Sequence, residues 1–360
     1  MQRVGNDVLL IKMRSMMSSE SSSSAAPFGL DQQGDLFGVA SDVDPVGAAD
    51  VAADLVDLRS QLPVALRLGT SSWSFPGWAG IVYARRVGEQ LLARDGLRAY
   101  AKHPLLGAVS VDRSFYAPMT TQEFARYADK VPADFRFVVK AHAALITPLD
   151  RHDKRAVGSS SDHFLDSDYA IERVIEPAVA GLGERLGAIL FQFSPLSVRY
   201  TREPSRFVSA LGDFLERLPR GPQYAVEIRN REFLTRDYTD ALARSGVTHC
   251  FNVHPRMPDV LQQADLLGPA ASLSGTVVVR WMLHPTQEYQ AARERYFPFD
   301  RLIDPDARSR TAISQLLLRL RAQGNETIVI ANNKAEGSAP LSLVGLAREL
   351  VARQPLGSSL

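Results

Sequence analysis

The feature that most constrains this chain is a series of short apolar runs that alternate with helix-like segments. Each run has five or six residues, the usual length of a buried strand, and the alternation is typical of repeated β/α units with a parallel sheet. Eight parallel strands with right-handed crossovers close most naturally into a barrel. The eight runs are Leu66–Thr70, Gly107–Asp112, Phe135–Lys140, Ala188–Phe193, Gln223–Ile228, Val247–Asn252, Thr276–Trp281 and Thr327–Ala331.

We therefore predict the α/β class and a single (β/α)8 TIM barrel over residues 63–354. The chain has 360 residues and 45% hydrophobic content, enough for a barrel of this type, which needs about 250 residues. An open, doubly wound sheet is the alternative. No glycine-rich nucleotide fingerprint follows any of the runs, which favours the barrel.

Several helix boundaries are also predicted. Thr120–Glu123 has the pattern of a capping box, and Asp168 is expected to cap a later helix. Pro177 lies within the apolar stripe of that helix, so we expect a kink or break there. A short amphipathic helix is expected within Val51–Leu62.

Both ends of the chain differ from this pattern. Residues 1–62, apart from the short helix near 51–62, contain a serine run at Ser18–Ser24 and no sustained apolar periodicity. Such a segment buries too little apolar surface to offset its ordering entropy. We predict a disordered N-terminal tail before the barrel and a short C-terminal tail over residues 355–360.

Charge and cysteine content limit the partners. The 41 basic and 40 acidic residues give a net charge of +1, so no global field attracts nucleic acid or an anionic membrane. The single cysteine, Cys250, excludes an intramolecular disulfide and suits a reducing compartment. Val8–Ile11 is too short for a signal-peptide core, and no stretch reaches the roughly 18 apolar residues of a membrane span. We expect a cytoplasmic protein without direct nucleic-acid or membrane binding.

Polar residues end most of the apolar runs, where the working face of such a barrel lies. Because a buried charge is expensive unless it is paired, we expect Lys140, Glu227, Arg229 and Arg280 to converge in one pocket. The alternative is an internal ion-pair network that only closes the barrel. The candidate catalytic residues are Glu227 and Lys140, and the candidate ligand-binding residues are Trp73, Asp112, Tyr116, Gln192, Arg229, Arg280 and Asn333.

Histidines near the strand ends raise the question of a metal. His142, His254 and His284, with Asp112 and Glu227, offer nitrogen and oxygen ligands of the kind that divalent ions use. None of these histidines has a helical i, i+4 partner or the tight spacing of a metal motif. A divalent metal is therefore not favoured, no metal ligands are assigned, and the cofactor is left unknown.

At these strand ends the sequence resembles the YecE-like family, also called domain of unknown function 72. The resemblance implies a TIM barrel and, by the family's usual grouping, a loose link to sugar isomerases. Ser110 and Asp112 stand where relatives usually carry Glu and Asn, and Lys334 stands where they usually carry His. The motifs that carry the resemblance are Gly69–Trp78, Ser114–Tyr116, Phe135–Ala141, Leu190–Phe193, Ala225–Arg229, Val279–Arg280, Asn332–Asn333 and Glu336–Pro340.

Two functions are open for the barrel. In an enzyme acting on a small anionic or sugar-like ligand, which is phosphorylated in one version of this hypothesis, Glu227 would be the general acid or base. Lys140, Arg229 and Arg280 would hold the negative group of the ligand, and Gln192 and Asn333 would orient it. A non-catalytic ligand-binding barrel is favoured instead if Glu227 is locked between Arg229 and Arg280.

A third hypothesis concerns the N-terminal tail. Gln33-Gly34-Asp35-Leu36-Phe37 resembles the pentapeptide by which bacterial proteins dock on the replication sliding clamp. Gln33 would enter one pocket of the clamp, and Leu36 and Phe37 would fill another. A disordered setting is what a docking peptide requires, so the sequence also predicts a protein that a clamp recruits to DNA.

Overall fold

The computed structural model describes residues 44–148, 163–268 and 275–354. All the observations below concern the compact unit that begins at Asp44. The predicted docking peptide Gln33–Phe37, residues 1–43 of the tail predicted over residues 1–62, and the predicted tail at residues 355–360 lie outside the described residues. Residues 44–62, the rest of the predicted N-terminal tail, are described.

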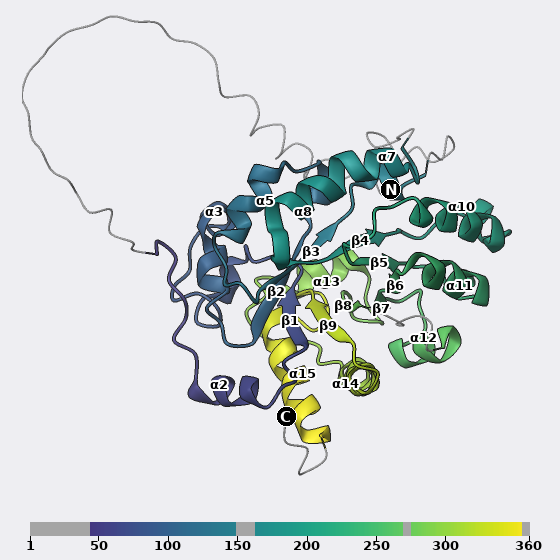
Figure 1. Cartoon of the computed structure of the whole chain (residues 1–360). Helices are drawn as coiled ribbons and strands as arrows, with labels where there is room; N and C mark the ends of the chain where they lie inside the picture. Colours follow the sequence, from purple (N-terminus) through teal and green to yellow (C-terminus); the bar gives the residue numbers. More distant parts are fainter. Residues whose placement is uncertain (1–43, 149–162, 269–274, 355–360) are drawn as a thin grey trace, which may run out of the picture. The chain divides into compact units, whose positions relative to one another are not determined.

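A parallel sheet curls into a nearly closed barrel (Figure 1). Its strand order is β6-β5-β4-β3-β2-β1-β9-β8-β7. Cys250 alone separates β6 from β7, and its backbone N–H donates to the carbonyl of Val226 at 2.8 Å, so these two segments are one interrupted strand. The predicted eight-unit barrel is confirmed. The strands are β1 Leu66–Thr70, β2 Leu106–Val111, β3 Arg136–Lys140, β4 Leu186–Gln192, β5 Tyr224–Glu227, β6 Thr248–His249, β7 Phe251–Val253, β8 Thr276–Trp281 and β9 Glu326–Ala331.

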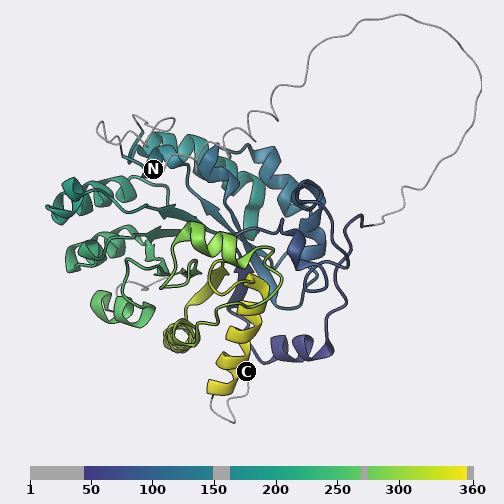
Figure 2. The same cartoon turned by 180° about the vertical axis from the view of Figure 1, so that it is seen from behind.

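Helices surround the strands on the outside (Figures 1 and 2). The expected helix within Val51–Leu62 is present as α2. No helix in the described ranges is long and apolar enough to cross a bilayer. The helices are α2 Ala53–Ser60, α3 Glu89–Tyr100, α4 Arg113–Tyr116, α5 Thr121–Ala128, α6 Ala143–Ile146, α7 Ser167–Ala170, α8 Glu176–Leu182, α9 Val198–Thr201, α10 Pro204–Glu216, α11 Arg236–Ser245, α12 Val260–Leu267, α13 Tyr289–Tyr296, α14 Ala307–Ala322 and α15 Ala339–Arg353.

The predicted helix boundaries are largely confirmed. Thr120 and Glu123 form a complete capping box at the start of α5. The prediction for Asp168 is wrong: Asp166 has the extended backbone of a cap and its carboxylate accepts from the N–H of Tyr169, whereas Asp168 already lies in the first turn of α7. The irregularity expected at Pro177 is a π-helical segment, Ile171–Ile175, directly before α8. Pro177 has no N–H for the i to i−4 bond.

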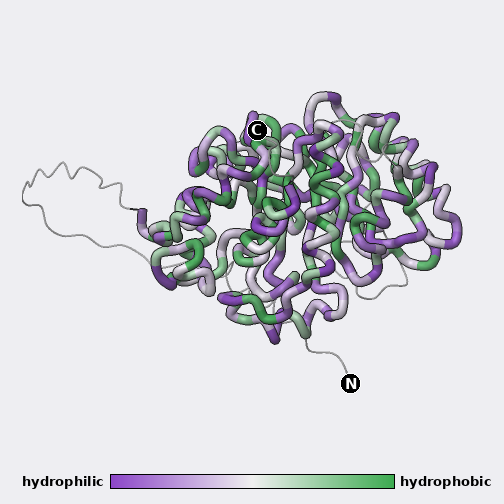
Figure 3. The backbone as a smooth tube through the Cα atoms, turned by 90° about the horizontal axis from the view of Figure 1, so that it is seen from below, coloured by the Kyte–Doolittle hydropathy of each residue, from purple (hydrophilic) through white to green (hydrophobic). Residues whose placement is uncertain are grey.

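The core has two layers. A large layer lies between the strands and the helices, and in Figure 3 the most hydrophobic stretches run through the interior. A smaller cluster fills the barrel lumen and mixes small with branched side chains, as the taper of a small barrel requires. The lumen cluster consists of Ala108, Val138, Ala188, Leu190, Ala225, Cys250, Val278, Ile328 and Ile330.

Candidate functional site

A layer of polar side chains lies directly above the apolar lumen cluster, toward the carboxyl ends of the strands. Successive strand residues alternate between the two faces of a sheet, so a residue two positions after a lumen residue also faces inward. The next layer of inward-facing side chains therefore carries nitrogen and oxygen atoms in place of the apolar groups of the lumen cluster. The lumen residues Ala108, Val138, Leu190, Ala225, Cys250, Val278 and Ile330 are followed at this spacing by Ser110, Lys140, Gln192, Glu227, Asn252, Arg280 and Asn332.

Glu227 lies at the centre of this polar layer. Its side chain is 0% exposed, and its two oxygens have different partners. Oε1 accepts from Arg229 Nε at 2.7 Å, and Oε2 accepts from Arg280 Nη1. Arg280 Nη1 also donates to Gln192 Oε1 at 2.9 Å. Arg280 on β8 therefore links β4, through Gln192, and β5, through Glu227, at their carboxyl ends.

The charge state of Glu227 follows from these contacts. Burial alone would raise the pKa of this carboxyl, but Arg229 and Arg280 outweigh burial and lower the pKa to about 2. Both oxygens are already bonded, so the carboxylate is permanently ionised at neutral pH. A group in this state holds two guanidinium groups in place and exchanges protons poorly.

Lys140 ends β3 at the edge of the same cluster. Its side chain is nearly buried, and Nζ lies 4.3 Å from the centroid of the Phe115 ring. Burial lowers the pKa of Lys140, Asp112 raises it, and Arg280 lowers it further. A cation–π contact contributes about 2 kcal/mol even when desolvated, whereas burial of an ammonium costs several kcal/mol. The cost of burial therefore exceeds the stabilisation from Phe115, and the neutral form of Lys140 is favoured relative to a solvated lysine. The four side chains Lys140, Glu227, Arg229 and Arg280 converge, as their common strand direction predicts.

A second group of side chains adjoins this cluster beside Asp112. Ser110 donates to Asp112 Oδ1 at 2.8 Å. Lys334 Nζ lies 4.4 Å from the centroid of Tyr289, and the pKa of Lys334 is lowered to about 8, first by burial and then by Arg293. Asp112 acts in the opposite sense on that pKa, which places it near Lys334.

Two tyrosines border this part of the site. Burial raises the pKa of Tyr116, as do the charge of Asp112 and the nearby Tyr289. Tyr116 and Tyr289 are 63% and 60% exposed. The site therefore has an aromatic rim that a ligand can reach from solvent.

Three predicted site residues remain: Gln192, Asn333 and Trp73. Gln192 is in the cluster, through Arg280. Asn333 is buried and fixed by its Oδ1, which accepts from Trp78 Nε1 at 3.2 Å and from the N–H of Ala339 at 2.8 Å, and its Nδ2 has no partner in the described part of the chain. Trp73 points elsewhere: its Nε1 donates to the carbonyl of Leu92 on α3 at 3.0 Å. The structure thus packs Trp73 between the barrel and its outer helices.

The histidines considered as metal ligands have separate partners. His142 Nδ1 lies 2.8 Å from the Tyr169 hydroxyl, and His284 Nδ1 lies 2.9 Å from Thr286 Oγ1. Burial, with Arg229 next in effect, lowers the pKa of His254 to about 4. Among the described residues, no three His, Cys, Asp or Glu side chains gather as a metal-binding group.

Sequence reasoning missed Lys334 and Tyr289 as members of the site. Lys334 follows the eighth apolar run by three residues, and the resemblance had singled it out only as a departure from the family pattern. Tyr289 begins α13, after the loop that follows β8, and no local pattern in the sequence directs that loop toward Asp112.

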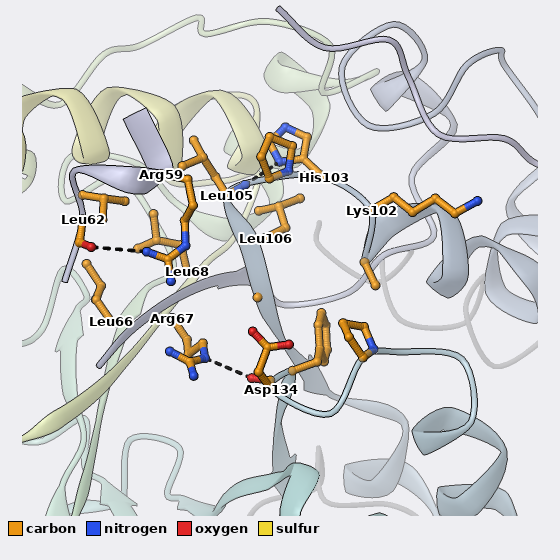
Figure 4. A pocket seen from close by; sticks show the side chains of 15 residues that line it. Arg59, Leu62, Leu66, Arg67, Leu68, Lys102, His103, Leu105, Leu106 and Asp134 are labelled. Atoms are coloured by element: carbon orange, nitrogen blue, oxygen red, sulfur yellow. Dashed lines mark hydrogen bonds between the residues drawn. The ribbon is translucent and has the colours of Figure 1, made fainter. Parts of the chain in front are cut away.

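A cavity of about 160 Å³ lies at the opposite end of the barrel (Figure 4). It is lined at the amino ends of β1, β2 and β3. Arg59 Nη1 donates to the carbonyl of Leu62 at 3.4 Å, and Arg67 Nε donates to the carbonyl of Asp134 at 3.0 Å. None of the polar-layer residues lines this cavity, so the two are separate. The amino-terminal face of such a barrel usually serves stability.

Fold and site together define a (β/α)8-barrel protein with a cationic cluster at the carboxyl ends of its strands. The model of the family "Protein of unknown function DUF72" matches residues 67–359, so the chain belongs to this family. No protein of curated function matches it.

Solved structures of DUF72 family proteins have a similar fold. A DUF72 family protein from Enterococcus faecalis V583 has a TM-score of 0.53 at 17% identity, over 80% of this chain and 96% of that one. A DUF72 family protein from Thermotoga maritima MSB8 has a TM-score of 0.50 at 20% identity, over 79% of this chain and 98% of that one. At these identities the likeness concerns the fold alone.

Proposed function

We propose that this barrel binds a small organic anion at the carboxyl ends of its strands. The observation that carries the proposal is an excess of positive charge in a poorly solvated place. Four cationic side chains face two carboxylates there: Lys140, Arg229, Arg280 and Lys334 against Asp112 and Glu227. Uncompensated charge in such a place is costly, and an anionic ligand removes that cost.

The contacts within the cluster support this direction. Both oxygens of Glu227 are bonded to arginines, so Glu227 forms an ion pair with neither lysine. Arg280 Nε is buried and has no hydrogen-bond partner within the described residues. Arg229 is more accessible than Arg280, with 17% of its side chain exposed against 1%. A carboxylate or phosphate group fits the planar donors of such a guanidinium.

The aromatic rim supports an organic ligand over a bare inorganic anion. Tyr116 and Tyr289 are largely exposed beside Asp112 and Lys334. Aromatic faces of this kind pack against sugar rings, planar rings or carbon chains. In this proposal Glu227 positions Arg229 and Arg280 instead of acting as the general acid or base.

Thermal shift and calorimetry with a panel of carboxylates, sulfate, phosphate and sugar phosphates test the proposal. At a ligand concentration of a hundred times Kd, a binding anion stabilises the folded state by about 2.7 kcal/mol. Arg229→Gln should weaken binding at least tenfold, because a hydrogen bond to a charged group contributes about 1.5–3 kcal/mol. Arg319→Gln is the matched control, since Arg319 pairs with Asp265 at 2.8 Å on the surface. Equal affinity of wild type and Arg229→Gln would overturn the proposal.

A further inference from the structure

Lysine is scarce in this chain, and its placement is selective. The sequence has six lysines among 41 basic residues, so arginine supplies most of its positive charge. Four of the lysines lie in the described ranges. Lys102 is exposed and pairs with Asp44 at 3.3 Å, and Lys130 donates to the carbonyl of Arg94. The other two, Lys140 and Lys334, both lie at the carboxyl ends of the strands.

Lys140 differs from the surface lysines in its surroundings. It forms no ion pair with any described residue, and its Nζ rests on the Phe115 ring. It is buried beside two arginines that Glu227 holds in place. Burial and the charge of Arg280 lower its pKa, although Asp112 opposes them. Arginine at this position would keep its charge, whereas lysine can lose a proton and become a nucleophile.

We infer that Lys140 is a nucleophile that forms a covalent imine with a small anion carrying an aldehyde or ketone group. This inference rests on the proposed anion binding and names its ligand class. Arg229 binds the carboxylate or phosphate of the ligand, and the carbonyl carbon lies against Lys140 Nζ. Lys140 supplies the nucleophile for the carbonyl group, and Arg229, held by Glu227, supplies the donor for the anionic group.

The step is balanced within the site and solvent. The neutral Nζ gives its lone pair to the carbonyl carbon, and one proton moves from nitrogen to the former carbonyl oxygen to form a carbinolamine. The hydroxyl then takes one more proton and leaves as water, while the nitrogen lone pair forms the C=N bond of the iminium. Asp112 is the carboxylate available to pass these protons, because Glu227 has both oxygens bonded to arginines.

Reductive trapping tests this inference on the full-length protein. Pyruvate, glyoxylate and glyceraldehyde phosphate are each added with borohydride, which reduces an iminium to a stable secondary amine. With at least one of these probes we expect a single adduct per chain, whose mass is that of the carbonyl compound less one oxygen, and peptide mapping should locate it on Lys140. The exposed Lys102 reports non-specific labelling in the same sample. Adduct at Lys102 equal to that at Lys140, or an adduct on Lys334 in place of Lys140, would overturn the assignment.

Two variants complete the test. Lys140→Arg keeps the positive charge and should abolish the adduct while the circular dichroism spectrum stays unchanged. Lys140→Met replaces it if the arginine variant does not fold. An adduct that persists at full yield in a folded variant at position 140 would contradict the inference.

Lactate, glycolate and glycerol phosphate separate this inference from the proposed function, because they are anions without a carbonyl group. Thermal stabilisation by these compounds and by the carbonyl probes, with no adduct from any probe, would overturn the role of Lys140 and leave anion binding intact. No stabilisation by any anion of either panel would overturn the proposed function together with this inference.

Discussion

Glu227 and Arg280 form an ion pair from which solvent is excluded, with exposed side-chain fractions of 0% and 1%. The pair joins β5 to β8 across the interrupted strand made of β6 and β7. Arg229 completes the neutralisation of Glu227 from the loop that follows β5, at 2.7 Å. The stability of the barrel at the carboxyl ends of its strands and the placement of the cationic site therefore depend on the same carboxylate.

Glu227→Gln should leave a folded but weakened protein. Removing one charge of a buried pair leaves its partners uncompensated, and such changes cost about 3–5 kcal/mol. Urea unfolding measures the loss. Asp265→Asn is the control, since Asp265 pairs with Arg319 at 2.8 Å on the surface, where the loss should stay below about 1 kcal/mol. Equal, small losses in both variants would show that the buried pair adds nothing to stability, and failure to obtain folded protein would favour a purely structural network.

Stability should fall as pH drops below neutrality, through His249. This imidazole is fully buried between the Tyr238 hydroxyl at 3.0 Å and Gln263 Oε1 at 3.2 Å, and burial lowers its pKa from 6.5 to about 4. The unfolded chain therefore binds more protons between these values. The stabilisation is fully present above about pH 6.5 and is lost as pH falls toward 4, by up to about 3 kcal/mol.

Denaturant unfolding near pH 7 and near pH 5 measures this loss. His249→Gln removes the titrating group and keeps an amide at the same position, so its stability should change less between the two pH values. A pH dependence in the variant as steep as in wild type would assign the effect to other groups.

Gly69→Ala should destabilise the barrel. A Cβ at position 69 would lie 2.1 Å from the backbone oxygen of Ala108, where β1 and β2 approach closely and their register shifts. Overpacking against backbone costs about 1–3 kcal/mol. Gly88→Ala is the matched control, because a Cβ there meets nothing within 4 Å. The two variants should differ clearly in urea midpoint, and similar midpoints would contradict the tight contact.

The sequence-based docking prediction is tested separately with a peptide. A peptide of residues 31–38 should bind purified sliding clamp at micromolar strength, about 8 kcal/mol of binding free energy. The double substitution Leu36→Ala, Phe37→Ala should abolish binding, because these side chains would fill the apolar pocket. Fluorescence anisotropy measures both peptides. Equal binding of the two, or no binding of the native peptide, would end the hypothesis.

The sequence determined the architecture of the described barrel because its signals are local. Apolar runs of strand length and the capping box at Thr120 depend only on neighbouring residues. The common direction of parallel strands also predicted that Lys140, Glu227 and Arg280 lie at the same end of the barrel, since each ends or follows an apolar run. These features follow from backbone geometry and do not depend on the conformation of the loops.

Only the tertiary structure decided which of these groups are bonded to one another. Glu227 could have faced a ligand, and instead Arg229 and Arg280 hold both its oxygens. Trp73 turned outward to Leu92, and Lys334 and Tyr289 joined the site from loops. The physical reason is that periodicity fixes the direction of a side chain relative to its own strand, whereas its partner depends on barrel closure and loop paths, which bring together residues far apart in the chain.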